Sequence, residues 1–409
     1  MTLNLRMAWR NLWRHKRRTW LTATAMIFSN VLLVFMISLQ LGSYDMMINN
    51  TLQAFSGHLQ VQRTGYNENP KLRTSMESIR PLAGQLRQAL PQARVTARAE
   101  GFVLASSEQR SFGIQVIGVQ PEYEAGVSTI PGLVRQGRYL HDSNAPEIVI
   151  GAVMAKNLKI DSGDELTLLG SGRDGSFAAG VLTVVGIFES GNQAMDRSFA
   201  EIPLGYFQDM FTMDGHGHSI AIALDSLDQI SAAHAVAESV IAGNDQLAVL
   251  DWNALHPGLK QAIQADFSSA WFMYGVLIIL VAFSVLNTQL MSVMERTHEF
   301  GVITALGIKP RKLASLVMLE TALMAMIGLI IGVFLGWLVA LYFNTAGFSY
   351  PGMEEMTERF NLPGAMYPAV SVLSMMLGPS VVFLFCMLAS IYPALRLLRL
   401  QPVEAMRAV

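Results

Sequence analysis

Four long apolar segments constrain the fold of this chain more than any other feature. The first, residues 20–42, runs for 23 residues without a charged side chain, which is enough to cross a hydrocarbon core of about 30 Å. Because the apolar part of a secretory signal is only about 7–15 residues long, we interpret this segment as an uncleaved membrane span. The sequence therefore predicts four transmembrane helices. Their expected ranges are 20–43, 268–293, 314–343 and 370–395.

The composition fits a chain that lies only partly in a membrane. Apolar residues make up 52% and charged residues 15%, against about 25% charged residues in a typical soluble domain. The net charge of −2 argues against nucleic acid as a partner. The single cysteine, Cys386, excludes an intrachain disulfide framework.

Basic residues are concentrated beside the apolar segments. Residues 1–19 hold six Lys/Arg and no acid, with tryptophans among them, which predicts an amphipathic helix along the membrane surface. The 294–313 loop adds four basic residues and the 396–409 tail three, whereas residues 44–267 hold 15 basic and 24 acidic residues. Because positive residues are enriched on the cytoplasmic side, we expect both termini and the 294–313 loop in the cytoplasm. The acidic segment is then expected outside.

The outer segment, residues 44–267, has the pattern of an α+β domain. A strand, an amphipathic helix and a second strand come early in it, and the same order returns near its end. Two β-α-β pieces around a central block favour one α+β subdomain with another, at about 107–205, inserted into it. The fold class is therefore an α-helical membrane protein with four spans and a large α+β periplasmic domain. The six expected elements are at 57–62, 77–90, 95–105, 219–224, 227–242 and 247–252, and a further outer loop is expected at 344–369.

Residues 287–313 join the second apolar segment to the third and carry a polar and an apolar face at helical spacing. Gly307 fits a C-cap, and Pro310 prevents the helix from continuing. A short amphipathic helix on the cytoplasmic side is the expected docking place for a cytoplasmic partner. The polar residues are Glu295, Arg296, His298 and Glu299, and the apolar ones are Phe300, Val302, Ile303 and Leu306.

The third apolar segment has two unusual features. Gly328, Gly332 and Gly336 recur at every fourth residue, which allows another helix to approach closely, either inside the bundle or across a dimer seam. Glu320 places a carboxylate about two turns into the span, and such a group usually faces protein or water rather than lipid. Proton coupling is the alternative interpretation of Glu320.

No catalytic or nucleotide-binding motif is present. The chain has no G-x-x-x-x-G-K-[ST] loop, no H-E-x-x-H and no G-x-S-x-G. His216 and His218 are candidate metal ligands, but two histidines without further ligands favour a solvated turn. We therefore expect no catalytic residue and no metal site, and a protein that is not an enzyme.

Four stretches together resemble one family, the FtsX-like permeases of the MacB and LolCDE class of ABC transporters (type VII). Within that class the chain looks like the LolC/LolE-like subunits, which have no fused ATPase. The stretch after the second span is the most specific of the four. The sequences are MSVMERTHEFGVITALG at 291–307, YPALRLLRLQPVEAMR at 392–407, EIVIGAVMAKNLKIDSGDELTL at 147–168 and AWRNLWRHKRRTWLT at 8–22.

The resemblance implies a permease dimer bound to a pair of ATPase subunits in the bacterial inner membrane. The MacB chain includes an ATPase, whereas this sequence has no such motif, so ATP and Mg²⁺ would bind to the partner and this chain would hold no cofactor. Closing of the ATPase pair would move the spans and the outer domain, with porter-like halves around a Sabre-like block. The residues that match the ATPase-coupling segment are Glu295, Arg296, Glu299, Phe300, Gly301, Leu306 and Gly307.

The cargo is expected to be hydrophobic. In LolCDE-like members the first and second spans of both subunits frame a cavity for lipoprotein acyl chains, open toward the outer leaflet. The matching residues here are apolar or aromatic with one polar exception, which favours lipoprotein, lipid or another hydrophobic cargo. They are Phe28, Leu32, Phe35, Met36, Phe283, Leu286, Asn287 and Leu290.

Two alternatives come from other branches of the same family. One is MacB-like efflux of peptides or toxins with an adaptor and an outer-membrane channel. The other is an FtsX-like scaffold that switches a cell-wall hydrolase, although an outer domain of this size exceeds what such a scaffold needs. The second permease is a copy or a paralogue, a periplasmic lipoprotein carrier is a further candidate partner, and residues 170–175 are a candidate partner-binding turn.

Overall fold

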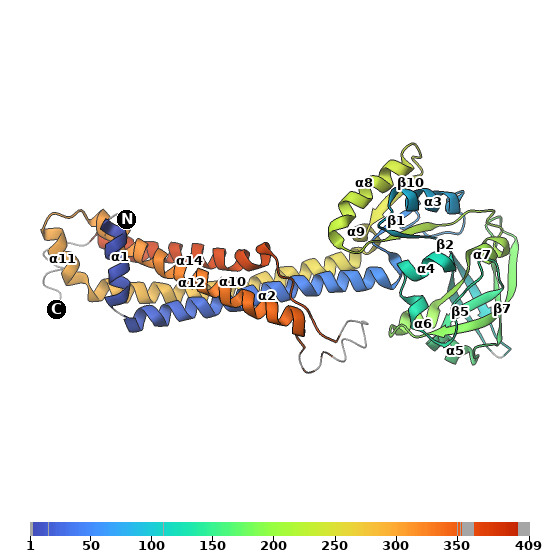
Figure 1. Ribbon diagram of the computed structural model, residues 1–409, viewed down its shortest axis with the longest axis horizontal. Coiled ribbons are helices and arrows are strands. Elements are labelled where there is room, and N and C mark those ends of the chain that lie inside the picture. Colours follow the sequence, from blue (N-terminus) through green and yellow to red (C-terminus); the bar gives the residue numbers. More distant parts are fainter. Residues whose placement is uncertain are drawn as a thin grey trace. The chain divides into compact units, whose positions relative to one another are not determined.

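The computed structural model describes residues 3–14, 16–108, 110–349, 351, 353 and 364–399. It divides into two compact units, one helical and one built on a mixed sheet (Figure 1). The helical unit comprises residues 1–44, 263–349 and 365–409, and the sheet unit comprises residues 45–262 and 350–364. Much of the expected 344–369 loop and the tail from residue 400 lie outside the described residues.

Within the described residues, four helices are long and apolar enough to cross a membrane, so the prediction of four spans is confirmed. Each is longer than its expected span, because polar residues beyond an apolar run continue a helix where their helix propensity allows it. The second of these helices begins with Pro257 at its first position, where proline is well tolerated. The helices are α1 (Leu3–Arg14), α2 (Lys16–Thr51), α10 (Pro257–Glu295), α11 (Thr297–Ala305), α12 (Pro310–Ala346) and α14 (Val372–Leu398).

The glycine stripe of α12 packs against α2 inside the chain. A Cβ atom added to Gly332 would lie 2.5 Å from the Cβ atom of Asn30, and one added to Gly336 would lie 2.8 Å from that of Val34. The Asn30 Nδ2 atom also donates a 3.1 Å hydrogen bond to the carbonyl of Gly328. Close backbone approach therefore lets a polar side chain find its partner on the neighbouring helix, as expected for small residues at a membrane helix interface.

The sheet unit alternates strands with short helices. A π-helical turn, η1 (Leu52–Ser56), leads into its first strand. The strands are β1 (Leu59–Arg63), β2 (Arg94–Ser106), β3 (Ser111–Val119), β4 (Val134–Gly137), β5 (Glu147–Gly151), β6 (Glu165–Ser171), β7 (Phe177–Phe188), β8 (Phe199–Pro203), β9 (Ser219–Ala223) and β10 (Leu247–Asp251). The helices are α3 (Ile79–Ala89), α4 (Pro121–Val127), α5 (Ala152–Leu158), α6 (Gln193–Ser198), α7 (Leu204–Met210), α8 (Ile230–Ile241) and α9 (Trp252–Leu255), with 3₁₀ turns η2 (Ile130–Leu133) and η3 (Leu227–Gln229).

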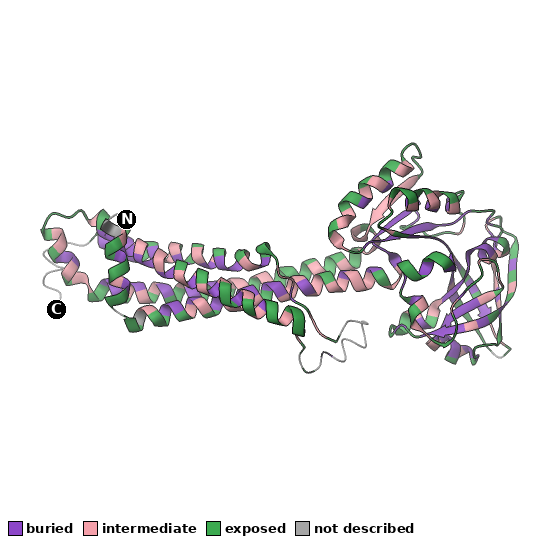
Figure 2. Cartoon of the chain, viewed as in Figure 1, coloured by how far each residue is buried: buried purple, intermediate pink, exposed green. Residues whose placement is uncertain are grey.

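All ten strands belong to one sheet in the order β10-β1-β9-β2-β3-β8-β5-β7-β4, with β6 paired to β2 and β7. The two β-α-β pieces interleave, because β1 lies between β10 and β9, and β9 pairs with β2. The central block shares this sheet through the pairing of β2 with β3. The strands are largely buried (Figure 2), and the expected α+β fold class is confirmed.

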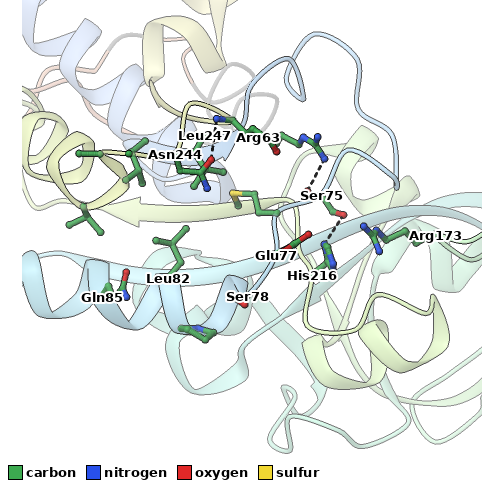
Figure 3. Close-up of a pocket in the computed structure, with 17 residues that line it drawn as sticks. Arg63, Ser75, Glu77, Ser78, Leu82, Gln85, Arg173, His216, Asn244 and Leu247 are labelled. Atoms are coloured by element: carbon green, nitrogen blue, oxygen red, sulfur yellow. Dashed lines mark hydrogen bonds between the residues drawn. The ribbon is translucent and has the colours of Figure 1, made fainter.

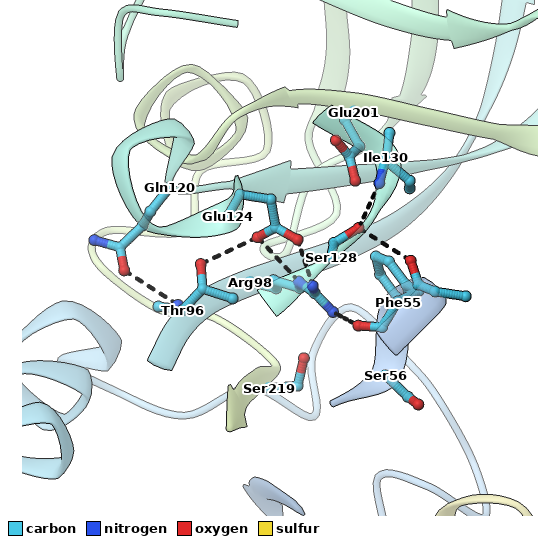
Figure 4. Close-up of polar contacts among 12 residues, drawn as sticks. Phe55, Ser56, Thr96, Arg98, Gln120, Glu124, Ser128, Ile130, Glu201 and Ser219 are labelled. Atoms are coloured by element: carbon cyan, nitrogen blue, oxygen red, sulfur yellow. Dashed lines mark hydrogen bonds and ion pairs between the residues drawn. The ribbon is translucent and has the colours of Figure 1, made fainter. Parts of the chain in front are cut away.

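A buried ion pair joins three elements of the sheet unit (Figure 4). Arg98 on β2 contacts the carboxylate of Glu124 on α4, and both side chains are fully buried. The Arg98 Nη1 atom donates to the carbonyl of Phe55 in η1, and the guanidinium lies 4.0 Å from the centre of the Phe55 ring. Because an unpaired buried charge is costly, this pair fixes η1 against the sheet.

Glu201 on β8 is a second buried carboxyl in the same region. The Tyr139 hydroxyl donates to the Glu201 Oε2 atom at 2.6 Å, and the Oε1 atom has no hydrogen-bond partner in the part of the chain that the structure describes. Burial, together with the nearby carboxylate of Glu124, raises the pKa of Glu201 to about 8. The folded domain therefore keeps a proton on Glu201 at neutral pH.

We expect the unfolding temperature to fall as the pH rises from about 5 to about 8. The unfolded carboxyl releases its proton near the ordinary value of 4.5, whereas the folded one keeps it up to its raised pKa, so proton loss favours the unfolded state throughout that range. Glu201→Gln stays neutral and should show a smaller fall. Scanning fluorimetry of the full chain in detergent measures both, and an equal fall in the two proteins would contradict the assignment.

Candidate functional site

The segment after α10 folds as the short helix α11, as its sequence signals predict. Gly307 has a φ of 94°, and its N–H donates to the Thr304 carbonyl at 3.0 Å. Lys309 is extended, and Pro310 occupies the first position of α12, where its fixed φ suits a helix start. A left-handed glycine and a proline therefore end one helix and begin the next.

The inner face of α11 is anchored by Phe300, which is only 1% exposed. Its ring packs in a cluster with residues of α10, α12 and α14, and Gly301 is also buried. These two residues of the expected coupling set therefore hold α11 on the span helices and do not lie on its surface. The other buried members of the cluster are Val293, Leu313, Val317 and Leu397.

Glu320 has two partners that its sequence position does not reveal. The Arg296 Nη1 atom lies 3.1 Å and 3.2 Å from its two carboxylate oxygens, and the Asn11 Nδ2 atom donates to its Oε1 atom at 2.7 Å. The side chains of Arg296 and Glu320 are only 12% and 7% exposed. This buried contact ties α1 and the start of α11 to α12, so Glu320 is an ion-paired anchor.

Arg296 also contacts the anchoring ring and a surface carboxylate. Its guanidinium carbon lies 4.8 Å from the centre of the Phe300 ring, and its Nε atom lies 3.6 Å from Glu299. Glu299 reaches Arg14 of α1 at 3.2 Å, but these two side chains are 43% and 63% exposed. Exposed pairs contribute little stability, so the buried Arg296–Glu320 pair dominates the site.

The outer side of this segment is open and includes three large exposed apolar residues. Leu306 is 79% exposed, and Glu295 and Gly307 are exposed as well. Val302 and Ile308 add to this face, with 39% and 43% of their surfaces exposed. Ile308 was absent from the expected coupling set because that set came from the family resemblance, and the resembling stretch ends at Gly307.

The expected cargo residues do not share one surface. Phe28 and Phe283 are 66% and 58% exposed, and Met36 and Asn287 are exposed as well. Phe35 instead packs against Phe343 of α12, with ring centres 5.3 Å apart, because it lies on the side of α2 that faces α12. The remaining three, Leu32, Leu286 and Leu290, are half-buried.

His218 corrects the expectation of a solvated histidine turn. It is completely buried, its Nδ1 atom accepts from the Glu100 N–H at 2.8 Å, and its ring stacks on Tyr66 at 5.0 Å. Burial lowers the pKa of His218 to about 4. Within the described residues no group of three or more His, Cys, Asp or Glu side chains is placed to hold a metal ion.

Comparison with known proteins shows the family. Residues 19–240 match the MacB-like periplasmic core domain, and residues 271–402 match the FtsX-like permease C-terminal family. The chain therefore belongs to the FtsX-like, MacB-type permeases of ABC transporters. It is a multi-pass membrane protein and a transport component, and its transporter includes an ABC ATPase.

The individual relatives are distant in sequence, but each match covers more than half of this chain. The lipoprotein-releasing system transmembrane protein LolC of Xylella fastidiosa is 26% identical over 308 residues, 71% of this chain and 72% of that protein. The macrolide export ATP-binding/permease protein MacB of Escherichia coli is 23% identical over 83% of this chain and 53% of that protein. The periplasmic region of MacB from Actinobacillus actinomycetemcomitans gives a TM-score of 0.39 at 16% identity, over 53% of this chain and 97% of that structure.

Breaking the Arg296–Glu320 pair should destabilise the chain strongly. We expect Arg296→Gln and Glu320→Gln each to lower the unfolding temperature, because each removes one partner of a buried ion pair, at a cost of about 3–5 kcal/mol. The double variant should lose less stability than the two single variants lose together. Scanning fluorimetry of the four proteins in detergent measures the coupling, and strictly additive losses would show that the pair does not act as a unit.

Proposed function

We propose that this chain couples ATP hydrolysis by a separate ATPase subunit to movement of its MacB-like domain. It would thereby extract or export lipoprotein, lipid or another hydrophobic cargo from the inner membrane. ATP and Mg²⁺ would be held by the ATPase pair. The observation that carries the proposal is the construction of α11, whose inner face is fixed to the spans and whose outer side exposes Leu306.

The anchoring of α11 supports its role as a lever. A partner that displaces α11 must also displace α12, because Phe300 and the Arg296–Glu320 pair join them. Asn11 extends the same contact to α1. Packed cores and buried ion pairs move as units and do not deform smoothly. A displacement of α11 would therefore be transmitted to the span helices.

The charge distribution supports a cytoplasmic position for α11. Residues 1–19 and the 294–313 loop are rich in Lys and Arg, whereas residues 44–267 are acidic. By the positive-inside rule, α11 and both termini would face the cytoplasm, where the ATPase resides. The MacB-like domain would then lie in the periplasm.

A variant of the outer face tests the docking surface. We expect Leu306→Glu to abolish or greatly reduce ATPase association, because it places a charge at the centre of an apolar contact. The matched control is Leu104→Glu, the same substitution at a 43% exposed site on β2. Co-purification of the co-expressed ATPase in mild detergent measures association, and wild-type recovery with Leu306→Glu would remove α11 as the docking element.

Exposed apolar residues support a hydrophobic cargo. Phe28 of α2 and Phe283 of α10 lie on the chain surface, where a second permease subunit would complete a cavity. In the sheet unit, Phe102 and Phe177 are 72% and 77% exposed. Large exposed apolar patches in water mark binding surfaces. The relative named as a lipoprotein-releasing protein favours acylated polypeptide as the cargo.

A second candidate function is export of a soluble peptide or toxin. The match to a macrolide export protein over 83% of this chain favours it. A periplasmic adaptor and an outer-membrane channel would then replace a lipoprotein carrier. The two functions differ in what purifies with the chain: acylated polypeptide in the first and an adaptor in the second.

Substitution of the exposed span aromatics tests the cargo cavity. We expect the Phe28→Ser, Phe283→Ser double variant to retain several-fold less acylated polypeptide, because burying each ring stabilises an apolar contact by about 1.5–3 kcal/mol. Phe334→Ser on α12, 56% exposed and outside the proposed cavity, is the matched control. Mass spectrometry of the purified complexes measures bound cargo. Equal retention by all three proteins would argue against a cavity between α2 and α10.

A further inference from the structure

The sheet unit contains a cleft of about 520 Å³ that the coupling proposal does not use (Figure 3). It lies where α3 begins and α8 ends, beside the paired ends of β1 and β10. Its volume falls in the range of ligand sites, about 300–1,000 Å³. The lining has a polar end and an apolar wall. The wall is formed by Leu82, Val240, Ile241 and Leu247.

The polar end carries two arginines, Arg63 at the end of β1 and Arg173 in the turn between β6 and β7. Neither takes part in an ion pair with any described residue. Among the described residues, the buried Nε atom of Arg173 has no hydrogen-bond partner, and the Arg63 guanidinium makes one long 3.5 Å contact, with the Ser75 carbonyl. Both arginines line the cleft and have no ion-pair partner among the described residues, so their guanidinium groups are available to an anion.

The lining around the two arginines contains few acidic residues, although the sheet unit as a whole is acidic. Residues 44–267 carry 24 acidic residues against 15 basic ones, yet Glu77 is the single acidic residue in the lining. His216 lies in the same end, and its Nδ1 atom is 3.3 Å from the Ser75 hydroxyl. Burial, with Arg173 nearby, lowers the pKa of His216, so at neutral pH it adds hydrogen bonding and no charge.

The pairing of β1 with β10 places a basic and an apolar lining residue side by side. Arg63 of β1 and Leu247 of β10 are directly paired residues, so a cation and an apolar side chain adjoin on neighbouring strands. Asn244 and Gln246 continue the lining with amide groups. Amides can pair with peptide groups, whereas an acyl chain would leave them unsatisfied at a cost.

We propose that this cleft binds an acidic polypeptide segment, with a carboxylate against Arg63 and Arg173 and a neighbouring apolar side chain on the Leu82–Leu247 wall. Arginine forks bind carboxylates through paired, charge-assisted hydrogen bonds. The segment belongs to a protein that meets the sheet unit from solution. The proposal is independent of ATPase docking at α11, because none of its residues belongs to the helical unit.

The test uses the full chain in lipid nanodiscs and a fluorescein-labelled peptide, acetyl-Leu-Glu-Leu-Asp-amide, followed by fluorescence anisotropy. We expect saturable binding that Arg63→Gln and Arg173→Gln each weaken about tenfold or more, the loss typical of one charge-assisted contact. The matched control Arg135→Gln changes an exposed arginine outside the cleft and should bind like the wild type. Unfolding temperatures confirm that each variant is folded.

Four outcomes would overturn the proposal. The wild type fails to bind the acidic peptide, or the neutral peptide acetyl-Leu-Gln-Leu-Asn-amide binds equally well. Alternatively, both arginine variants bind as the wild type does. Competition by sn-glycerol 3-phosphate at concentrations below those of the unlabelled acidic peptide would instead assign the cleft to a phospholipid headgroup. Because the two arginines are changed separately, the conclusion does not depend on the folding of one variant.

Discussion

The Arg296–Glu320 ion pair is the contact on which the helical unit most depends. A carboxylate within an apolar span is expensive unless it is paired, and here its partner lies at the junction between α10 and α11. The cost of burying Glu320 is thus offset only when α11 is in place. The same contact that stabilises the span also fixes the position of α11, so the stability of the bundle and the placement of the proposed coupling surface depend on one interaction.

The glycine stripe of α12 has a comparable role, because it fixes the packing of α12 against α2. Between helices in lipid there is little hydrophobic driving force, so close packing and interhelical hydrogen bonds hold them together. Gly332 brings α12 near enough to α2 that Asn30 reaches a backbone carbonyl. Bulk at that glycine would separate the helices and leave the Asn30 amide without its partner in an apolar environment. The Asn30–Gly328 hydrogen bond and the Arg296–Glu320 ion pair thereby specify one arrangement of the spans.

The features predicted from sequence are those that depend on local signals. Long apolar runs define the four spans, and Gly307 and Pro310 set the end of α11. The partners of Glu320 were not predictable, because Arg296 is 24 residues away and Asn11 is 309 residues away. Likewise, Phe35 shares a helix with Phe28 but turns toward α12, because helix rotation is decided by packing. The arginine cleft unites residues from separate strands and turns, which no short motif could connect.

The packing of α12 against α2 would limit how the proposed second permease subunit binds. The glycine face of α12 is already occupied by α2, so it is not free for another chain. Of the apolar windows of the spans, 56% is buried for α2 but only 17% for α10. α10 therefore has the smallest buried share of the four span windows, with Phe283 exposed on it. A subunit that docks beside α10 would leave the α2–α12 contact and the Glu320 anchor intact, so assembly and coupling would use different faces of the same bundle.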